Sequence, residues 1–304
     1  MKTFILDNIN TWPKLKNLTL TIGNFDGVHL GHQKLLNKVT SYTDTMSAAM
    51  TMNPHPSSVF KDKNYQTLIS VDVKKELISK FNVDYLFVVN FDVDFYTLSV
   101  EQFINKLIEL GVKRIVLGKD FRFAHKGLGI VNDLLPFFEV ISVDDVKLNS
   151  YRISTTLIKE LIQNGNITEA NACLGYKYFI KGFVEHGNKV GKTLGFPTAN
   201  INYKEAFLPK NGVYLVRLLI DEKYHYGICN IGNNPTINFS KIRKVEVFIL
   251  DYNEVIYDKD VKLEFITFIR DEKKFSSKED LIDAINNDEK VSRNIIKNTE
   301  SMIK

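Results

Sequence analysis

The spacing of apolar residues changes character once along the chain, near Gly175. Before that point, β-rich runs alternate with segments whose apolar residues recur at helical spacing. This alternation is typical of a parallel, doubly wound sheet with helices on its faces. The expected strands are 18–24, 48–52, 85–90, 114–118 and 138–143, and the expected helices are 31–42, 73–81 and 100–110. Ser99 and Gln102 form a capping box in front of the last helix.

After Gly175, short β-rich runs follow one another without helical segments between them. Turn residues separate the runs, which favours a closed or nearly closed antiparallel barrel. A final amphipathic helix is expected over 276–287, capped by Ser276 or Ser277. We therefore predict a Rossmann-like domain over residues 1–174 and a barrel domain over 175–304. The expected barrel strands are 179–185, 213–220, 225–231, 245–250 and 261–268.

Composition narrows the class of protein. The 304 residues are 44% apolar and 25% charged, which is ordinary for a folded protein with room for two cores. The net charge of +4 is spread along the chain without a basic block, so no nucleic-acid partner is expected. No apolar run approaches the roughly 20 residues of a membrane helix, and the N-terminus lacks a signal-peptide pattern. Cys173 and Cys229 have no metal-ligand spacing. We expect a cytoplasmic protein with small-molecule partners, and the oligomeric state is left open.

Residues 23–32, with the sequence Gly-Asn-Phe-Asp-Gly-Val-His-Leu-Gly-His, join an expected strand to an expected helix. The free N–H groups and dipole of a helix N-terminus favour phosphate binding. His29 and His32 are three residues apart and would face the same side, where they can donate hydrogen bonds to phosphate oxygens. Gly31 between them would let a nucleotide approach the backbone. A plain structured turn is the alternative, which the strand–turn–helix context disfavours.

Residues 187–200 contain a second glycine-rich motif. It is not a P-loop, because one residue is missing between its glycines and Pro197 stands where a helix should continue. We interpret it as a glycine-rich flap followed by an extended segment. In such a segment Thr198 and Asn200 point to the same face, and their oxygens suit Mg²⁺ together with nucleotide phosphates.

These motifs resemble those of a known family. Residues 23–32 resemble the HxGH signature of nucleotidylyltransferases, in the fuller form found in prokaryotic bifunctional riboflavin kinase/FMN adenylyltransferases (FAD synthetases). The resemblance runs across nearly the whole chain. Residues 53–56 are similar to the family's Pro-His-Pro loop, 118–123 to its GxDFxF segment, 153–159 to its ISSTxIR motif, and 197–200 to the PTAN signature of riboflavin kinases.

The resemblance implies a set of site residues for each reaction. In the adenylyltransferase it implies catalytic roles for His29 and His32, and ATP or FMN contacts from Gly23, Asn24, Phe25, Asp26, Gly31, His55, Asp120, Phe121, Ser154, Thr155 and Lys159. In the kinase it implies a catalytic Glu246, a magnesium site at Thr198 and Asn200, and ATP or flavin contacts from Gly187, Gly191, Lys192, Gly195, Pro197 and Arg270.

Glu246 is also unusual by its surroundings, because it shares an expected strand face with Phe248 and Leu250. A kinase acting on an alcohol needs a carboxylate near the hydroxyl, and Glu246 is the best candidate, although strand glutamates more often face solvent. For Arg270, which the resemblance places against flavin or nucleotide, a surface ion pair with Asp271 or Glu272 is the alternative.

The implied function is phosphorylation of riboflavin to FMN by ATP, followed by adenylylation of FMN to FAD with release of pyrophosphate, both with Mg²⁺. The chain departs from the family pattern at Lys159, where arginine is usual, and at Ala124, where glycine is usual. Lysine is a point charge and lacks the planar fork of arginine. These departures leave open a riboflavin kinase with a weak or inactive adenylyltransferase half. A non-catalytic flavin or nucleotide sensor is the other alternative, disfavoured by the complete motifs.

Overall fold

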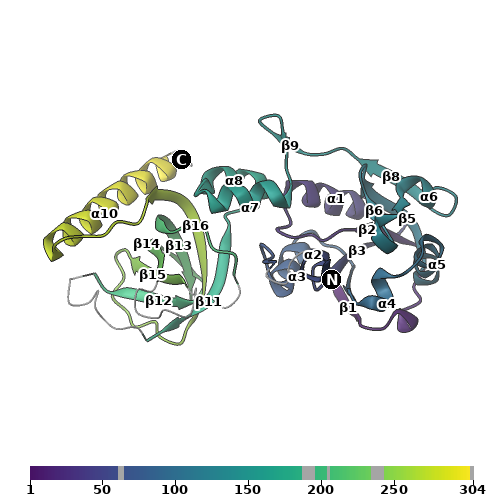
Figure 1. Ribbon diagram of the computed structural model, residues 1–304, viewed down its shortest axis with the longest axis horizontal. Coiled ribbons are helices and arrows are strands. Elements are labelled where there is room, and N and C mark those ends of the chain that lie inside the picture. Colours follow the sequence, from purple (N-terminus) through teal and green to yellow (C-terminus); the bar gives the residue numbers. More distant parts are fainter. Residues whose placement is uncertain (61–64, 187–195, 204–205, 234–242, 302–304) are drawn as a thin grey trace. The chain divides into compact units, whose positions relative to one another are not determined.

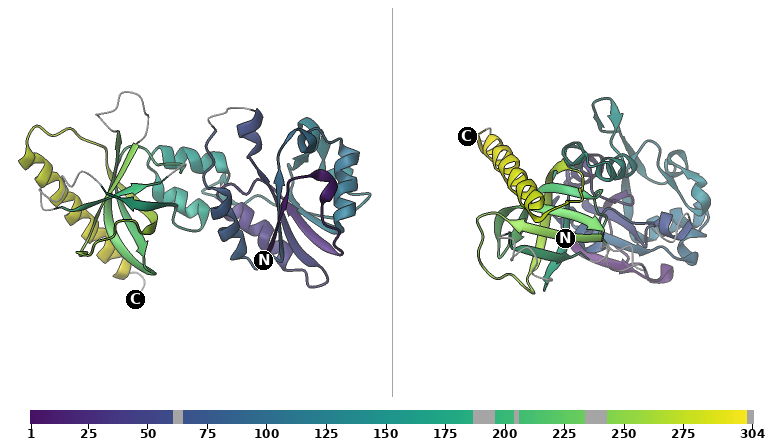
Figure 2. Two further views of the ribbon diagram at one scale, coloured as in Figure 1. Left: turned by 90° about the horizontal axis from the view of Figure 1, so that it is seen from below. Right: turned by 60° about the vertical axis from the view of Figure 1, so that its left-hand side comes forward.

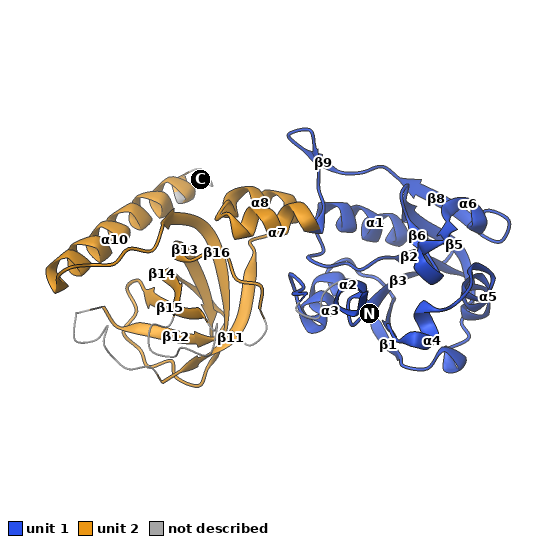
Figure 3. Cartoon of the chain, in the orientation of Figure 1, with its two compact units in different colours: residues 1–155 blue, residues 156–304 orange. Residues whose placement is uncertain are grey.

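The computed structural model describes residues 1–60, 65–186, 196–203, 206–233 and 243–301 (Figure 1). The chain divides into two compact units, Met1–Thr155 and Thr156–Lys304 (Figure 3). By their contacts, most of α7 (Thr155–Gln163) and all of α8 (Ile167–Leu174) belong to the second unit. The functional boundary that the motifs place after residue 174 stays a prediction. No helix in the described ranges is both long and apolar enough to cross a membrane.

The first unit is built on a six-stranded sheet in the order β1-β4-β3-β2-β5-β8, with all neighbours parallel. The chain winds from β2 to β3 and β4 on one side, then crosses to β5 on the other. The carboxyl ends of β2 and β5 therefore form the switch point where such sheets bind ligands. The strands are β1 (Lys2–Leu6), β2 (Leu18–Ile22), β3 (Met46–Asn53), β4 (Tyr85–Asn90), β5 (Val112–Gly118) and β8 (Glu139–Val143).

The alternating pattern predicted five strands of this sheet and its three main helices, and it missed the edge strand β1. The helices are α1 (Leu30–Thr40), α2 (Pro56–Phe60), α3 (Val71–Ser79), α4 (Val93–Tyr96), α5 (Val100–Leu110) and α6 (Val131–Leu134). The capping box of Ser99 and Gln102 is present at the start of α5. Two short hairpins complete the unit: β6 (Arg122–Phe123) with β7 (Gly129–Ile130), and β9 (Lys147–Leu148) with β10 (Tyr151–Arg152).

The two faces of this sheet are covered by different helices (Figure 2). Leu20 and Ile22 belong to the same buried core as Leu107 of α5. Successive strand residues point to opposite faces, so Thr19 and Thr21 point the other way, toward the face that α1 covers. With both faces covered, β2 is buried along its whole length. Its carboxyl end is thereby fixed in position.

The second unit is a closed barrel of six antiparallel strands in the order β11-β12-β15-β14-β13-β16. The sequence predicted this barrel and missed β12, which it described only as extended. The strands are β11 (Phe179–Glu185), β12 (Thr198–Asn202), β13 (Gly212–Ile220), β14 (Lys223–Asn233), β15 (Arg243–Ile249) and β16 (Asp260–Arg270).

The final helix, α10 (Lys278–Ser301), is much longer than the expected 276–287. The Ser277 hydroxyl accepts the backbone N–H of Asp280 at 3.1 Å, so Ser277 rather than Ser276 caps the helix. The helix continues past Asn287 because Ile296, in its second half, packs against Val213, Ile228 and Leu250 of the barrel unit.

Candidate active sites

The turn after β2 has an unusual backbone conformation. Phe25 and Val28 have positive φ angles of 48° and 38°, although neither is glycine, and both are buried. The buried carboxylate of Asp26 accepts the backbone N–H of Ile69 at 3.3 Å, and the Asp26 carbonyl accepts the Thr155 hydroxyl at 2.9 Å. Strained backbone held by its surroundings is concentrated at functional sites. This is the segment in which the sequence predicts nucleotide binding.

His29 and His32 lie against each other at the start of α1. Their rings are stacked, with centroids 3.7 Å apart and planes 18° apart. Burial lowers the pKa of His29 to about 4, and burial together with the neighbouring His29 and Lys74 lowers the pKa of His32 well below its usual value. Both rings are therefore neutral at pH 7. His29 Nδ1 accepts the backbone N–H of His32 at 3.4 Å, so the proton of the neutral His29 ring is on Nε2.

Gly31 leaves room for the His29 ring. A Cβ at this position would lie 3.0 Å from Cε1 and 3.1 Å from Nδ1 of His29, closer than side chains normally pack. From the sequence, this glycine is expected to let a nucleotide approach the backbone. The structure adds a reason within the protein itself, because a side chain here would push the His29 ring away from His32.

Lys74 of α3 is a buried cation near the same turn, and it was not predicted from the sequence. It is 4% exposed, and its ammonium donates to the Thr51 hydroxyl at 3.1 Å. That hydroxyl in turn donates to the Asn24 carbonyl at 3.0 Å. Burial lowers the pKa of Lys74 to about 8, against the opposing effect of Asp26. A signal was present in the sequence, because Lys74 precedes the buried Leu77 by three residues and so lies on the apolar face of the helix.

A cavity of about 820 Å³ lies at the carboxyl ends of β2 and β5. Gly23 and Asn24 line it from the turn after β2, and Asp120 and Phe121 line it from the loop after β5. Two motifs far apart in the sequence therefore meet at the switch point of the sheet. Aromatic walls of this kind suit a flat heteroaromatic ligand. The aromatic side chains lining the cavity include Phe60, Phe91, Phe95, Tyr96, Phe103 and Phe123.

Ala124, which also lines this cavity, has φ 63° and ψ −170°. Only glycine adopts this region of backbone space without strain. The departure from the family pattern at this position is therefore visible as strain in the structure.

Two further residues implied by the resemblance have neighbours that the sequence did not predict. Asp120 accepts a hydrogen bond from Arg152 at 2.7 Å, and this contact lowers the pKa of the Asp120 carboxyl. The half-buried His55 ring stacks on Tyr65, with centroids 4.7 Å apart. His55 Nδ1 accepts the backbone N–H of Ser57 at 3.1 Å, which fixes the ring orientation.

Thr155 donates a hydrogen bond from its hydroxyl to the Asp26 carbonyl in the turn after β2. The half-buried Ser154 directly precedes α7, where the first N–H groups of a helix lack partners within the helix. Lys159 belongs to the second unit, and its ammonium lies 5.5 Å from the centroid of the Phe207 ring. Its contact with ATP phosphates stays a prediction.

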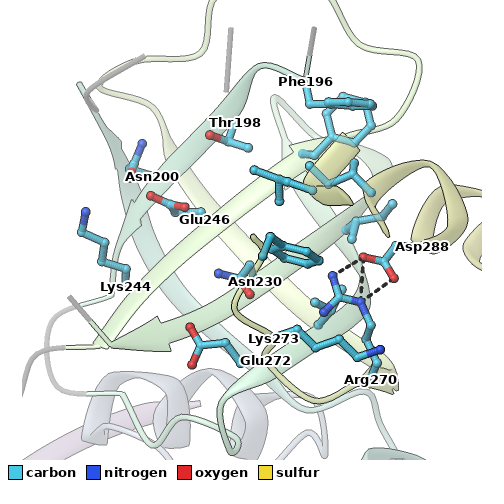
Figure 4. Close-up of a pocket in the computed structure, with 16 residues that line it drawn as sticks. Phe196, Thr198, Asn200, Asn230, Lys244, Glu246, Arg270, Glu272, Lys273 and Asp288 are labelled. Carbon is cyan, nitrogen blue, oxygen red and sulfur yellow. Dashed lines mark hydrogen bonds and ion pairs between the residues drawn. The ribbon is translucent and has the colours of Figure 1, made fainter. Parts of the chain in front are cut away.

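In the second unit, Asn200, Glu246 and Asn230 form a row across three barrel strands. Asn200 of β12 lies directly opposite Glu246 of β15, and Glu246 lies directly opposite Asn230 of β14. Directly opposed residues of antiparallel strands project to the same face. Thr198 lies two residues before Asn200 on that face, and all of these residues line a cavity of about 410 Å³ (Figure 4).

The strand pattern of β15 explains how a carboxylate and an aromatic ring come to share this cavity. Val245, Val247 and Ile249 are buried, whereas Glu246 and Phe248 alternate with them and are half-buried at the cavity. The sequence predicted that Glu246 shares a strand face with Phe248 and Leu250. The structure confirms this for Phe248, whereas Leu250 lies after the end of β15 and is buried. The Phe196 ring meets Phe248 edge-on, with centroids 5.3 Å apart. The other apolar residues of the wall include Val213, Ile228, Leu281 and Ile285.

Arg270, at the end of β16, lines the same cavity and pairs with Asp288 of α10 at 2.8 Å. The alternative of an ion pair with Asp271 or Glu272 is wrong. The carboxylate partner of Arg270 is Asp288, and its contact with Asp271 is to the backbone carbonyl, at 3.1 Å. Asp288 was not predicted from the sequence. It follows Leu281 and Ile285 at helical spacing, which was the available signal.

The remaining kinase residues implied by the resemblance belong to the glycine-rich segment. Pro197 is exposed immediately before β12. Gly187, Gly191, Lys192 and Gly195 lie outside the described residues.

Comparison with known proteins places both units in one family. A family model for FAD synthetase matches residues 12–157, and one for riboflavin kinase matches residues 174–296. The bifunctional riboflavin kinase/FMN adenylyltransferase of Listeria monocytogenes is 38% identical over 96% of this chain and 98% of its own length. The protein of the same name from Bacillus subtilis is 36% identical over 88% of this chain and 89% of its own.

A solved structure extends the likeness to the fold. A crystal structure described as a macrolide-efflux protein from Streptococcus pneumoniae is 29% identical, with a TM-score of 0.90 over 96% of this chain and 99% of that chain. The two bacterial relatives and this solved structure each cover both the parallel sheet and the barrel. The chain belongs to the family of bifunctional riboflavin kinase/FMN adenylyltransferases.

Proposed function

We propose that the two activities of this family are divided between the two units, with FMN adenylylation in the first and riboflavin phosphorylation in the second. The chain uses ATP to convert riboflavin to FMN and then FMN to FAD. The observation that carries the division is that each unit has its own cavity, of about 820 Å³ and about 410 Å³, lined by its own motifs. The two family models match the chain in the same division.

In the second unit, Glu246 serves as the base for the terminal ribityl hydroxyl of riboflavin. The hydroxyl proton moves to the Glu246 carboxylate while its oxygen bonds to the γ-phosphorus of ATP. The bond between that phosphorus and the oxygen bridging to the β-phosphate breaks, and ADP leaves. Asn200 and Asn230 lie directly opposite Glu246 on the two neighbouring strands and line the same cavity.

Thr198 and Asn200 fit a magnesium ion shared with ATP. Their hydroxyl and amide oxygens are hard ligands on one strand face, next to the Glu246 carboxylate. Mg²⁺ accepts such a sparse protein donor set when nucleotide phosphates and water supply its other ligands. When bound, the ion neutralises charge on the β- and γ-phosphates.

In the first unit, a phosphate oxygen of FMN attacks the α-phosphorus of a second ATP. The bond from that phosphorus to the oxygen bridging to the β-phosphate breaks, and pyrophosphate leaves. His29 and His32 are neutral and donate ring N–H groups to the phosphate oxygens on which charge develops. The N-terminus of α1 adds its dipole. Loss of one such donor raises the barrier by about 3 kcal/mol.

The flat ring of FMN fits the aromatic cavity of the first unit. The rings of Phe121 and Phe123 are stacked in its wall, with centroids 5.9 Å apart. Asp120 lies in the same loop and pairs with Arg152. Gly23 and Asn24, which belong to the same turn as His29, also line this cavity. In this proposal the flavin phosphate lies close to the turn after β2, where the ATP phosphates would bind.

The partners of this chain are the small molecules of the two reactions. We infer a cytoplasmic location, in keeping with the free thiols of Cys173 and Cys229.

The proposal is tested by incubating the purified protein with riboflavin, Mg²⁺ and ATP and separating the flavins by chromatography. FMN should appear first and FAD should then accumulate. A folded protein that forms no FMN contradicts the kinase assignment. FMN without FAD would instead support a kinase whose adenylyltransferase half is inactive.

A further inference from the structure

The cavity of the second unit has two chemically different ends. Thr198, Asn200 and Glu246 form one end, where the proposed function places the ATP phosphates and the reacting hydroxyl. Figure 4 shows Arg270 and Asp288 on the opposite side of the cavity. The apolar side chains that complete the wall include Val213, Ile228, Phe248, Leu281 and Ile285.

Arg270 and Asp288 form a bidentate ion pair. Arg270 Nε lies 2.8 Å from Oδ1 of Asp288, and Nη2 lies 2.8 Å from Oδ2. The Asp288 side chain is only 3% exposed, and that of Arg270 is 19% exposed. Nη1 donates to the Asp271 carbonyl at 3.1 Å. The plane of the guanidinium is thus fixed from two sides, and it still has N–H donors beyond those used in these contacts.

This pairing changes what Arg270 can recognise. A guanidinium without a carboxylate partner is a strong phosphate ligand. Here a buried carboxylate balances its charge, and a phosphate brought to the same place would be repelled by Asp288. A neutral ligand with carbonyl and N–H groups along one edge can still accept its remaining hydrogen bonds. Riboflavin is neutral, has such an edge on its ring, and carries its reacting hydroxyl at the other end.

We propose that Asp288 is a positioning residue that orients Arg270 toward the polar edge of the flavin ring and makes this end of the cavity specific for riboflavin over phosphate. The inference rests on the proposed kinase function of this unit. Leu281 and Ile285, which precede Asp288 on the same face of α10, contact the flat ring. The final helix therefore supplies both the apolar wall and the carboxylate of the riboflavin subsite.

The test compares two aspartate–arginine ion pairs, each of which has one residue on α10. Asp251 forms an exposed bidentate pair with Arg293, at 2.9 and 2.8 Å, which lies outside the cavity lining. Asp288→Asn should raise the KM for riboflavin about tenfold, the effect of losing one charge-assisted contact. The KM for ATP and kcat should stay within about twofold of wild type. Asp251→Asn should leave all three parameters unchanged.

Removing one partner of a buried ion pair can unfold a protein. We therefore include Arg270→Gln and the double variant Arg270→Gln/Asp288→Asn, which has no unpaired charge. If Asp288 acts through Arg270, the riboflavin KM of the double variant should equal that of Arg270→Gln alone.

The outcomes of this comparison test the positioning role of Asp288 separately from the proposed kinase function. Additive increases in KM, or a folded Asp288→Asn enzyme with unchanged riboflavin KM, overturn the positioning role. A uniform fall in kcat with a rise in both KM values would show a merely structural role and would also overturn it. A folded wild-type protein without kinase activity contradicts the proposed function instead.

Discussion

The stacked rings of His29 and His32 are neutral at pH 7, because burial at the start of α1 lowers both pKa values. With centroids 3.7 Å apart, two protonated rings would repel each other strongly. The adenylyltransferase site therefore offers phosphate oxygens neutral N–H donors, and the positive end of the helix dipole supplies the electrostatic attraction. This arrangement links the site to the stability of the first unit.

The free energy of unfolding should fall as the pH is lowered from 6.5 toward 4. Between these values the unfolded chain protonates His29, whose ordinary pKa is 6.5, whereas the native chain does not until about pH 4. The unfolded state thus binds more protons, and stability is lost as the pH falls. The full shift corresponds to about 3 kcal/mol.

Urea unfolding at pH 7 and pH 4 measures this dependence. His29→Gln should show a shallower loss of stability than wild type, and the exposed His186→Gln should not. Equal pH dependence in His29→Gln and wild type would show that the His29 pKa is not lowered.

Lys74→Met should slow FAD formation from FMN about tenfold and leave riboflavin phosphorylation unchanged. The variant loses the contact from the ammonium to Thr51, whose hydroxyl bonds the Asn24 carbonyl, and a charged hydrogen bond is worth about 1.5 kcal/mol at the lower end of its range, which corresponds to about tenfold. The matched control is Lys75→Met, because the half-buried Lys75 pairs with the exposed Asp72 at 3.2 Å. Steady-state rates for both variants check the prediction, and similar losses in the two would refute the role of the buried cation.

Ala124→Gly should stabilise the first unit by about 1 kcal/mol. Glycine relieves the strain at φ 63° and ψ −170°, which outweighs its larger entropy loss on folding. Ala49→Gly, in the middle of β3, should instead destabilise by a similar amount. Denaturant unfolding of both variants measures the two effects, and a destabilised Ala124→Gly would show that the strain is absent.

A fragment of residues 174–304 should phosphorylate riboflavin and form no FAD, while a fragment of 156–304 should do the same with greater stability. The longer fragment keeps α8, where the Asn171 side chain donates to the Phe265 carbonyl at 2.9 Å and accepts the Tyr178 N–H at 2.6 Å. Two such bonds contribute about 2 kcal/mol. If only the longer fragment is active, the functional boundary lies between Thr155 and Thr156, where the two compact units divide, and not after residue 174.

Apolar periodicity was sufficient to predict the two architectures. The parallel sheet followed from alternating β-rich and helical runs, and β4 and α5 have the bounds that were expected. This succeeded because the period of apolar residues is a local property of each segment. The length of α10 was missed for the same reason: its second half is held by packing against the barrel, which no local pattern records.

The sites depend on contacts between distant segments, and prediction from sequence was correspondingly partial. The same-face placement of Thr198 and Asn200 could be derived, because it requires only an extended backbone. The alignment of Asn230 with Glu246 requires the barrel register, and the pairing of Arg270 with Asp288 requires the position of α10. Lys74 was missed because a lysine is ordinarily assigned to a solvated helix face.

The division of the two reactions between the units is tested most directly by a pair of crossed variants. Glu246→Gln removes one carboxylate charge, so FMN formation should fall by roughly a hundredfold or more, while FAD formation from supplied FMN continues at the wild-type rate. His32→Ala should phosphorylate riboflavin normally and accumulate FMN, with FAD formation reduced on the order of a hundredfold. Both variants must first have the wild-type melting temperature.

The decisive measurement is FAD production from riboflavin by a mixture of the Glu246→Gln and His32→Ala proteins. Each variant alone should make little FAD, and the mixture should restore conversion, because FMN released by one protein diffuses to the other. If either folded variant loses both reactions, or if the mixture makes no more FAD than the variants do separately, the two-site account is contradicted.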